Sequence, residues 1–476
     1  MALRFILEIV LGALYLSLIT TTIVIILREN RKPVRALSWI LVLLLLPVAG
    51  LICYYIIGQY FRKRKIISKK KIRKVTKIPH ASYQLSTDET EFLHEHQRML
   101  IKLLEQNNNA TAFPCNRIDV LTNGKETFEA MFEAIEQAKE HIHIEFYIFG
   151  DDKISNQLRE LLIKKAQQGV RVRMIYDFLG SFSLSKKYIE SLNTAGVYVV
   201  PFLPARLKAA RIKINYRNHR KILVVDGKIG FTGGLNIADR YMEGNKLGMW
   251  RDTFVRMEGL AVHGLQTNFL IDWYFAGEKL IRDSKYYPAL HAVKNSLVQI
   301  VSSAPDSDWE NIMQGISYAI ITAQKYVYIH TPYFIPPETI LSAIQVAALS
   351  GIDVRLMIPQ KSDAPVSTAA SHSYVESVLE AGVKVFWYTD GFLHSKAIVI
   401  DDMISIVGSA NIDERSTSLN FELNAFIFNN ETAIELKKSF VEDMKQCNEI
   451  SIEKWEKRSS WNKLKESLAR LLSPMM

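Results

Sequence analysis

An internal duplication constrains this chain more than any other feature of its 476 residues. Residues 134–149 (AIEQAKEHIHIEFYIF) parallel residues 319–334 (AIITAQKYVYIHTPYF), and residues 219–240 (HRKILVVDGKIGFTGGLNIADR) parallel residues 394–415 (HSKAIVIDDMISIVGSANIDER). The separation falls from 185 residues in the first pair to 175 in the second, because the first copy has a longer basic loop before its histidine, at residues 204–218. Self-similarity of this kind indicates one structural unit repeated within the chain.

Both copies alternate amphipathic helical patterns with β-rich runs such as RVRMIY and DVRLMI. Alternating helices and strands are typical of an α/β domain built on a central sheet. We therefore expect two similar α/β domains with pseudo-twofold symmetry and one functional site at their junction. The expected domains cover residues 111–290 and 291–450, and an amphipathic helix is expected within residues 451–476.

Two apolar runs precede the repeat. Residues 9–27 and 36–60 carry no formal charge over 19 and 25 residues. A helix of either length could cross the roughly 30 Å hydrocarbon core of a bilayer. A cleaved signal peptide is the alternative for the first run, but no small-residue cleavage site follows it and a second run comes at once. We therefore expect a hairpin of two transmembrane helices within residues 1–61, with a kink at Pro47.

The positive charge of the chain is concentrated beside these runs. Residues 1–77 hold 15 Lys and Arg against two acids, so the remainder holds 44 basic and 47 acidic residues, which argues against nucleic acid as a partner. Ten of the basic residues lie in residues 62–77, within an expected juxtamembrane segment and linker at 62–110. Positive residues stay on the cytoplasmic side, so we expect both α/β domains to face the cytoplasm. The basic cluster either binds anionic lipid headgroups or only fixes the topology.

Each copy of the repeat contains the pattern HxKxxxxD, and an asparagine follows ten residues after the aspartate in a Gly-rich turn. The two sets are His219, Lys221, Asp226 and Asn236, and His394, Lys396, Asp401 and Asn411. A histidine and a lysine two residues apart on a strand point to the same face. Such a set suits a phosphodiester, because the ammonium attracts its oxygens, the amide donates hydrogen bonds, and the imidazole can act as nucleophile or acid.

Three further observations limit the chemistry. Asp226 and Asp401 count among the catalytic candidates, although their place at the turn end of a strand also fits hydrogen bonding to the loop. Ser409, in the second Gly-rich turn, is a weaker candidate for substrate binding. None of the three cysteines belongs to a CxxC pair, which argues against a thiolate metal site.

The paired motifs resemble those of the phospholipase D superfamily, and the chain is more closely similar to bacterial cardiolipin synthases. The similarity covers essentially the whole chain, including WRDTFVRMEGLAV at 250–262, IHTPYFIPPE at 329–338 and GSANIDERSTSLNFELN at 408–424. It implies a multi-pass protein of the bacterial inner (cytoplasmic) membrane that needs no metal and no cofactor. One phosphatidylglycerol would give its phosphatidyl group to a second through a phosphohistidine, which yields cardiolipin and glycerol.

The resemblance also implies roles for individual residues. His219 would be the nucleophile and His394 the general acid and base, although the near-symmetry of the copies leaves the reverse assignment open. A carboxylate beyond each motif, Asp252 after the first and Glu422 after the second, would orient the histidines. For Asp252, an ion pair with Arg251 is the alternative. Which carboxylate meets which histidine stays open. The expected phosphate-binding residues are Lys221, Lys396, Asn236 and Asn411, and the expected orienting carboxylates are Asp252 and Glu422.

Alternatives remain for the function and for the C-terminus. A hydrolase would use water as the acceptor, whereas an inactive scaffold would be expected to have lost a motif histidine or lysine, and all four are present. Residues 455–474 are basic, with Trp and Leu at helical spacing, so this helix either lies in the bilayer interface or packs on the domain. The expected partners are phosphatidylglycerol and anionic membrane lipids. The sequence specifies no oligomeric state.

Overall fold

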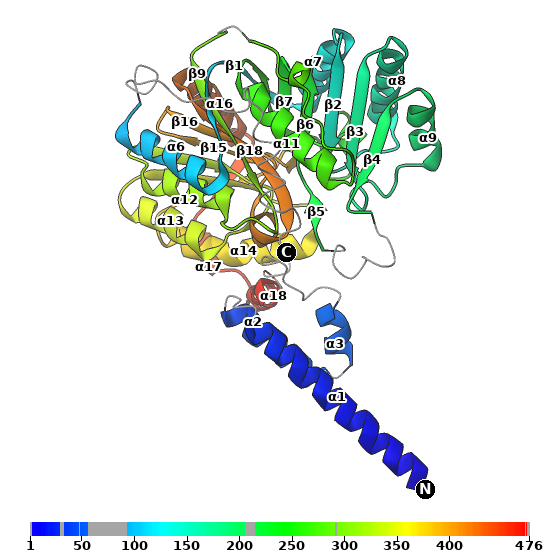
Figure 1. Cartoon of the computed structure of the whole chain (residues 1–476). Helices are drawn as coiled ribbons and strands as arrows, with labels where there is room; N and C mark the ends of the chain where they lie inside the picture. The colour runs from blue at the N-terminus through cyan, green and yellow to red at the C-terminus, as the bar shows by residue number, and fades with distance from the viewer. Residues whose placement is uncertain are drawn as a thin grey trace. The chain divides into compact units, whose positions relative to one another are not determined.

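The structure is a computed structural model that describes residues 2–28, 33–46, 48–55, 93–204, 215–290, 293–471 and 473. The chain divides into two compact units. One contains the N-terminal helices, and the other contains both copies of the repeat (Figure 1). The basic segment at 62–77 and the first part of the expected linker lie outside the described residues.

The N-terminal unit contains α1 (Ala2–Arg28), α2 (Pro33–Leu45) and α3 (Ala49–Cys53). The three helices share a small apolar cluster made by Ile19, Ile26, Leu43, Leu51 and Tyr54. Among the described residues, the segment Arg4–Arg28 of α1 is the one helix long and apolar enough to cross a membrane. This segment contains the whole of the first predicted apolar run.

The predicted second transmembrane helix is not confirmed. The described part of residues 36–60 is not one helix, because α2 ends at Leu45 and α3 begins at Ala49. Val48 between them has a left-handed φ of 62°, and the chain bends so sharply that a Cβ on Gly50 would lie 2.6 Å from the carbonyl oxygen of Val42. With 13 residues, α2 is about 20 Å long, too short to cross a bilayer. Pro47, where we expected a kink, lies outside the described residues.

The first copy of the repeat forms one α/β half. Its elements are β1 (Ala112–Asn123), α7 (Gly124–Glu136), β2 (His141–Phe146), α8 (Lys153–Gln167), β3 (Arg171–Asp177), α9 (Lys186–Thr194), β4 (Tyr198–Phe202), β5 (Arg217–Asn218), β6 (Ile222–Val225), β7 (Ile229–Gly233), η3 (Asp239–Tyr241), β8 (Trp250–Glu258), α11 (Ala261–Phe275) and η4 (Ser284–Tyr286). Its main sheet has the order β4-β3-β2-β6-β7-β8-β1, parallel from β4 to β2 and antiparallel afterwards.

The second copy repeats this plan. Its elements are β9 (Ser296–Ser303), α12 (Asn311–Ile321), β10 (Tyr326–His330), β11 (Phe334–Ile335), α13 (Glu338–Leu349), β12 (Asp353–Pro359), α14 (Pro365–Leu379), β13 (Lys384–Tyr388), β14 (Phe392–Leu393), β15 (Ala397–Ile400), β16 (Ile404–Gly408), β17 (Ile412–Asp413), α15 (Glu414–Ser418), β18 (Asn420–Phe428), α16 (Asn430–Met444) and β19 (Cys447–Ile450). The sheet order is β19-β13-β12-β10-β15-β16-β18-β9. The prediction of two similar α/β halves is therefore confirmed.

The two sheets are joined by one long strand. The second part of β1, Arg117–Asn123, pairs with β8, whereas its first part, Ala112–Asn116, pairs with β9 of the other half. The change of partner occurs around Cys115, which has a left-handed φ of 63°. In Figure 1 the teal and green strands β2–β4 of the first half lie on one side of this unit, and the yellow helices α12–α14 of the second half lie on the other.

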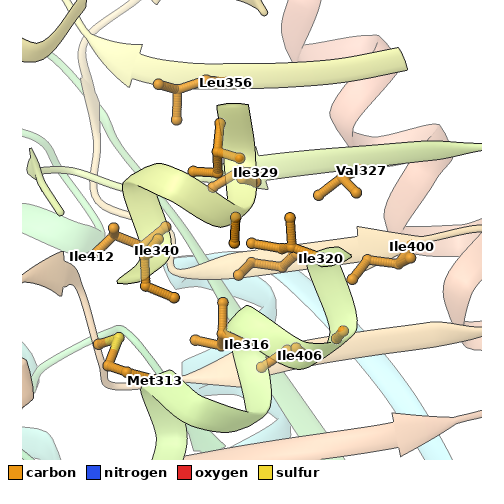
Figure 2. Packing of buried hydrophobic residues seen from close by; sticks show 14 of the residues in the cluster. Met313, Ile316, Ile320, Val327, Ile329, Ile340, Leu356, Ile400, Ile406 and Ile412 are labelled. Atoms are coloured by element: carbon orange, nitrogen blue, oxygen red, sulfur yellow. The ribbon is translucent and has the colours of Figure 1, made fainter. Parts of the chain in front are cut away.

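Each half has its own apolar core beneath its helices. In the second half, α12 buries Met313, Ile316 and Ile320 against β-strand side chains that include Val327, Ile329, Leu356, Ile400 and Ile406 (Figure 2). Complete burial of one such aliphatic side chain contributes about 1.5–3 kcal/mol. The equivalent first-half core packs α7 and α8 against β2 and β3. These cores hold the sheets whose strand ends carry the motif residues.

Among the described residues, three helices outside the repeat also belong to this unit. The helix α6 (Glu95–Asn108) precedes the repeat and buries Leu100 and Leu104 in the second-half core. After β19 come α17 (Ile452–Glu456) and α18 (Ser460–Leu471), and α18 packs on α14.

Candidate active site

Reciprocal strand pairing between the halves brings the two histidines to one place. The short strand β5 pairs with β18 of the other half, and β14 pairs with β8 in the same way. His219 follows β5, and its backbone N–H donates to the carbonyl oxygen of Phe421 at 2.9 Å. His394 follows β14, and its backbone N–H donates to the carbonyl oxygen of Arg251 at 2.7 Å. Both imidazoles are nearly buried, and both line one cavity of about 320 Å³.

The same pairing gives each histidine a carboxylate from the other half. His219 Nδ1 lies 3.0 Å from both oxygens of Glu422, and His394 Nδ1 lies 2.7 Å from Asp252 Oδ2. The sequence left this pairing open, and the structure shows that it crosses between the halves. A carboxylate at Nδ1 keeps the proton on that nitrogen and leaves Nε2 free for chemistry. Arg251 binds Asp443 at 2.9 Å instead, so its predicted alternative ion pair with Asp252 does not form.

Glu422 lies in a dense network of donors. Besides His219, its oxygens accept hydrogen bonds from Ser409 Oγ, from Ser416 Oγ at 2.8 Å and from Asn420 Nδ2 at 3.0 Å. Burial raises the pKa of Glu422, but His219, Lys221 and the hydrogen bonds outweigh burial and lower the pKa below its ordinary value. Ser409 is therefore placed behind the carboxylate, where it holds Glu422 in position, and it is not among the residues that line the cavity.

Asp252 has a different environment. It accepts the backbone N–H of Thr253 at 2.8 Å as well as the hydrogen bond with His394. Burial raises the pKa of Asp252 to about 6, against the opposing charge of Lys396. Gly234, the counterpart of Ser409, lies so close that a Cβ there would be 2.2 Å from Asp252 Oδ1. The different residues of the two Gly-rich turns thus follow from the two carboxylates that the turns accommodate.

The motif lysines lie beside the histidines. Lys221 Nζ donates to the carbonyl oxygen of His219 at 2.6 Å, and Lys396 Nζ lies 2.9 Å from His394 Nδ1. Burial lowers the pKa of Lys221 to about 7 and that of Lys396 to about 8. Both are enclosed and are not cavity-lining residues, so they place positive charge directly behind the imidazoles.

Both imidazoles favour the neutral form. Burial lowers the pKa of His219 to about 4, although Glu422 acts in the opposite direction. Burial and then Lys396 lower the pKa of His394 well below its ordinary value. A neutral imidazole with its proton on Nδ1 has a free electron pair on Nε2, as a nucleophile requires.

The motif asparagines line the same cavity. Asn236 accepts the backbone N–H of Ile148 at 3.2 Å and donates to the Tyr241 hydroxyl at 3.1 Å. Asn411 donates to Asp413 Oδ2 at 3.0 Å. Each asparagine is therefore fixed at the cavity wall by its neighbours.

The motif aspartates lie elsewhere. The Asp226 carboxylate accepts the backbone N–H groups at residues 139–141, each at 2.8 Å, and Asp401 accepts those at residues 324–326 at 2.7–2.9 Å. Both aspartates sit in turns with a left-handed φ, and each anchors the start of a neighbouring strand, β2 or β10. The structure therefore does not bring these two candidates together with the histidines.

Several cavity-lining residues were absent from the sequence prediction. Two of them carried a signal in the repeat, because Arg240 and Arg415 each follow the motif asparagine by four residues. The others stand at positions where the copies differ, so the repeat does not identify them. These additional lining residues include Tyr147, Arg217, Tyr241, Trp250, Tyr333 and Asp363.

Comparisons with known proteins agree with this geometry. The family model described as "Cardiolipin synthase, PLD-like domain" matches residues 131–249 and again 316–444, and the one described as "Phospholipase_D-nuclease N-terminal" matches residues 17–59. The two matched segments of the first family fall on the two halves of the repeat and include both HxKxxxxD motifs.

Relatives of nearly the same length share much of the sequence. A cardiolipin synthase of Halalkalibacterium halodurans is 44% identical over 96% of this chain and 93% of its own length. The major cardiolipin synthase of Bacillus subtilis is 40% identical over 98% of this chain and 99% of its own length. A crystal structure of phosphatidylserine synthase from Haemophilus influenzae covers 79% of this chain and 100% of its own, with a TM-score of 0.60 and 16% identity, and so shares the fold. The chain belongs to the bacterial cardiolipin synthases of the phospholipase D superfamily, a family of phosphatidyltransferases.

Proposed function

We propose that this chain makes cardiolipin from two molecules of phosphatidylglycerol, with His219 as the nucleophile and His394 as the general acid and base. The observation that carries the proposal is the pair of imidazoles on one cavity, each oriented at Nδ1 by a buried carboxylate of the other half. Membership of the cardiolipin synthase family supports the same reaction.

In the first step, His219 Nε2 attacks phosphorus and forms a P–N bond, while the bond from phosphorus to the oxygen of the headgroup glycerol breaks. His394 donates its Nε2 proton to that oxygen, and glycerol leaves. The anionic phosphodiester raises the pKa of a neighbouring imidazole, so substrate binding itself helps to protonate His394. Glu422 stabilises the positive charge of the phosphorylated His219 ring.

In the second step, His394 takes the proton from a hydroxyl of the second phosphatidylglycerol. That oxygen bonds to phosphorus, the P–N bond breaks, and His219 returns to its neutral form. Lys221 and Lys396 supply positive charge near the phosphate, and Asn236 and Asn411 supply amide groups at the cavity wall. Asp226 and Asp401 hold the strands and take no part in proton transfer.

A product assay tests this proposal. Full-length protein in detergent receives phosphatidylglycerol alone, and mass spectrometry identifies the lipids formed. We expect cardiolipin and free glycerol, both lost in His219→Ala and in His394→Ala, and no effect of EDTA. Phosphatidic acid in place of cardiolipin would show that water is the acceptor and that the chain is a hydrolase.

We also propose a membrane location with the catalytic unit on the cytoplasmic side. The apolar helix α1 and the ten basic residues at 62–77 support this arrangement. We further infer a second membrane-embedded segment formed by α2 and α3, and a pseudo-twofold axis between the halves, which the reciprocal pairings of β5 and β14 support. Protease accessibility of the catalytic unit in sealed inside-out vesicles, and its protection in right-side-out cells, would test the orientation.

The C-terminal helix supports contact with lipid. One face of α18 packs on α14 and buries Ala469, whereas the other face exposes Trp461, Leu464, Leu468 and Leu471. An exposed apolar face with basic neighbours favours a bilayer interface. In a chain shortened to residues 78–476, Trp461→Ser with Leu468→Ser should reduce co-sedimentation with phosphatidylglycerol vesicles. Unchanged co-sedimentation would contradict this role for α18.

A further inference from the structure

The two ends of the active-site cavity are lined by different side chains. Near His219 lie two guanidinium groups, Arg217 and Arg415, together with Tyr147, whose ring is 5.0 Å from the His219 ring. Near His394 lies the carboxylate of Asp363, which accepts a hydrogen bond from the Tyr333 hydroxyl. The cavity is thus built by a repeated fold, but several of its lining residues differ between the two copies.

The position of Asp363 is specific to the second half. It precedes α14, so that Ala364 and Ser367 beside it also line the cavity. In the first half the corresponding strand, β3, is followed by residues 178–185 (FLGSFSLS), which contain no charged residue. Tyr333 likewise corresponds to Ile148, which carries no hydroxyl. Asp363 and Tyr333 therefore form a polar pair at one end of the cavity only.

The charge of Asp363 reaches His394. Burial and Lys396 lower the pKa of His394, and Asp363 opposes them with its negative charge. Asp363 also counts among the groups that raise the pKa of Lys396, against the larger effect of burial. The carboxylate also lines the same cavity as this imidazole, which would protonate the leaving oxygen.

In-line displacement at phosphorus determines which end of the cavity receives the leaving glycerol. The attacking nitrogen and the leaving oxygen stand on opposite sides of phosphorus. If His219 attacks, glycerol leaves on the side of His394, where Asp363 and Tyr333 lie. Glycerol is uncharged and keeps two further hydroxyls, and a carboxylate and a phenol are suitable acceptors and donors for them.

We propose that Asp363 and Tyr333 form a subsite that binds the glycerol headgroup, first as the leaving group of the donor and then as the attacking group of the acceptor. The inference rests on the proposed function and deepens it. The acceptor hydroxyl must approach phosphorus along the path by which the first glycerol left, because the second step reverses the geometry of the first. One subsite therefore selects a glycerol headgroup in both steps and disfavours water or a simple alcohol.

Arg240 completes this end of the cavity. Its guanidinium lies 4.9 Å from the Trp250 ring centroid, and the Trp250 ring lies 5.2 Å from His394. The acceptor carries a phosphate on its glycerol, whereas free glycerol does not. A cation near the glycerol subsite offsets the repulsion between that phosphate and Asp363.

A competition experiment in one tube tests the subsite. The full-length enzyme receives phosphatidylglycerol with equal concentrations of deuterated glycerol and 1-propanol, which lacks the two further hydroxyls. Capture of the phosphohistidine by these alcohols gives deuterated phosphatidylglycerol and phosphatidylpropanol, which mass spectrometry separates. The product ratio reports relative kcat/KM for the two alcohols and does not depend on how much of the enzyme is folded.

We expect Asp363→Ala to lower this ratio roughly 10- to 100-fold, the effect of losing hydrogen bonds to a charged group. Asp363→Asn should give an intermediate ratio, and Tyr333→Phe should lower it about threefold, since a neutral hydrogen bond contributes less. Glu380→Ala, at the opposite end of α14, is the matched control and should leave the ratio unchanged.

The outcomes separate the two proposals. A ratio within twofold of the wild-type value in both Asp363 variants, with cardiolipin still produced, overturns the subsite and leaves the proposed function intact. If Asp363→Ala gives too little product to measure, the ratio in Asp363→Asn decides. Wild-type enzyme that forms phosphatidic acid and no cardiolipin overturns the proposed function itself.

Discussion

The two histidine–carboxylate pairs are held by equivalent strands and yet differ in their surroundings. Glu422 accepts side-chain hydrogen bonds from two serines and an asparagine in addition to His219, and its pKa is lowered despite burial. Asp252 accepts a backbone N–H and the hydrogen bond with His394, and burial raises its pKa to about 6. Duplication thus gives both halves the same motif-bearing hairpin, and the neighbours of each carboxylate give Glu422 and Asp252 different pKa values.

The difference matches two chemical tasks. A phosphorylated imidazole carries positive charge through the life of the intermediate, and a carboxylate that stays ionised stabilises it. A general acid and base gains and loses a proton in each cycle, which fits a carboxylate whose own affinity for protons is higher. The surroundings of the two pairs therefore favour His219 as nucleophile and His394 as proton carrier.

Replacing each histidine with alanine should give the largest effects and should separate these roles. The test uses two donors, phosphatidylglycerol and a phosphatidyl ester of p-nitrophenol, whose leaving group needs no proton. His219→Ala should lose at least about 10⁴-fold in rate with both donors, because no covalent intermediate forms. His394→Ala should lose roughly 10²- to 10⁴-fold with phosphatidylglycerol and should recover a burst of p-nitrophenol with the ester.

Absorbance at rapid mixing measures the burst, and mass spectrometry of the acid-labile adduct locates the phosphoryl group. A burst in His219→Ala and none in His394→Ala would reverse the assignment.

Neutralising the carboxylates should give the next largest effects, and unequal ones. Glu422→Gln should lower kcat roughly 10³-fold, because the charge that stabilises the phosphorylated ring is lost and the amide can present the wrong hydrogen-bonding group to Nδ1. Asp252→Asn should lower kcat about 10²-fold, because Asp252 is the carboxylate that gives up its charge more readily. Single-turnover kinetics should place the loss in phosphohistidine formation for the first variant and in proton transfer for the second. Equal losses of kcat in the two variants would contradict the proposal that the Glu422–His219 and Asp252–His394 pairs have different tasks.

Much of this fold could be predicted from the sequence because the information is repeated. The parallel between residues 134–149 and 319–334 marks β2 and β10 with their preceding helices, and the HxKxxxxD spacing marks the hairpins. The same repeat contained Arg240 and Arg415 at matching positions. The alternation of helical and β-rich patterns and the spacing of the HxKxxxxD motif are local properties of the sequence, and both copies contain them.

The parts that could not be predicted depend on long-range or asymmetric contacts. The strands β5 and β14 have two residues each, and their partners lie 203 and 142 residues away, as the pairs Arg217–Asn420 and Trp250–Phe392 show, so no local pattern indicates the crossed pairing. Asp363 stands where the copies differ, so comparison of the copies does not reveal it. Residues 36–60 carry no formal charge, and composition alone does not show the sharp bend at Val48.

Exchanging the residues of the Gly-rich turns should have a smaller effect that depends on which carboxylate is near. In Gly234→Ser the new Cβ would collide with Asp252, displace it from His394 and lower kcat roughly 10²-fold. In Ser409→Gly, Glu422 loses one of several donors, so kcat should fall about tenfold. Steady-state kinetics with a thermal melt as control would measure both. Full activity in Gly234→Ser would show that Asp252 does not need this space.

The smallest predicted effect concerns pH and the two lysines. Burial lowers the pKa of Lys221 to about 7 and that of Lys396 to about 8, both below the usual lysine value. As the pH rises through these values the ammonium groups lose their charge and attract the phosphodiester less, so kcat/KM should fall several-fold between pH 7 and 9. A bound phosphate raises both pKa values, so the fall in kcat should begin at higher pH. In Lys221→Met the group that titrates first is gone, and the fall in kcat/KM should begin near the pKa of Lys396. A profile whose alkaline side does not move in this variant would show that Lys221 keeps its charge throughout, and that its burial is compensated by Glu422 more fully than the burial of Lys396 is by Asp252.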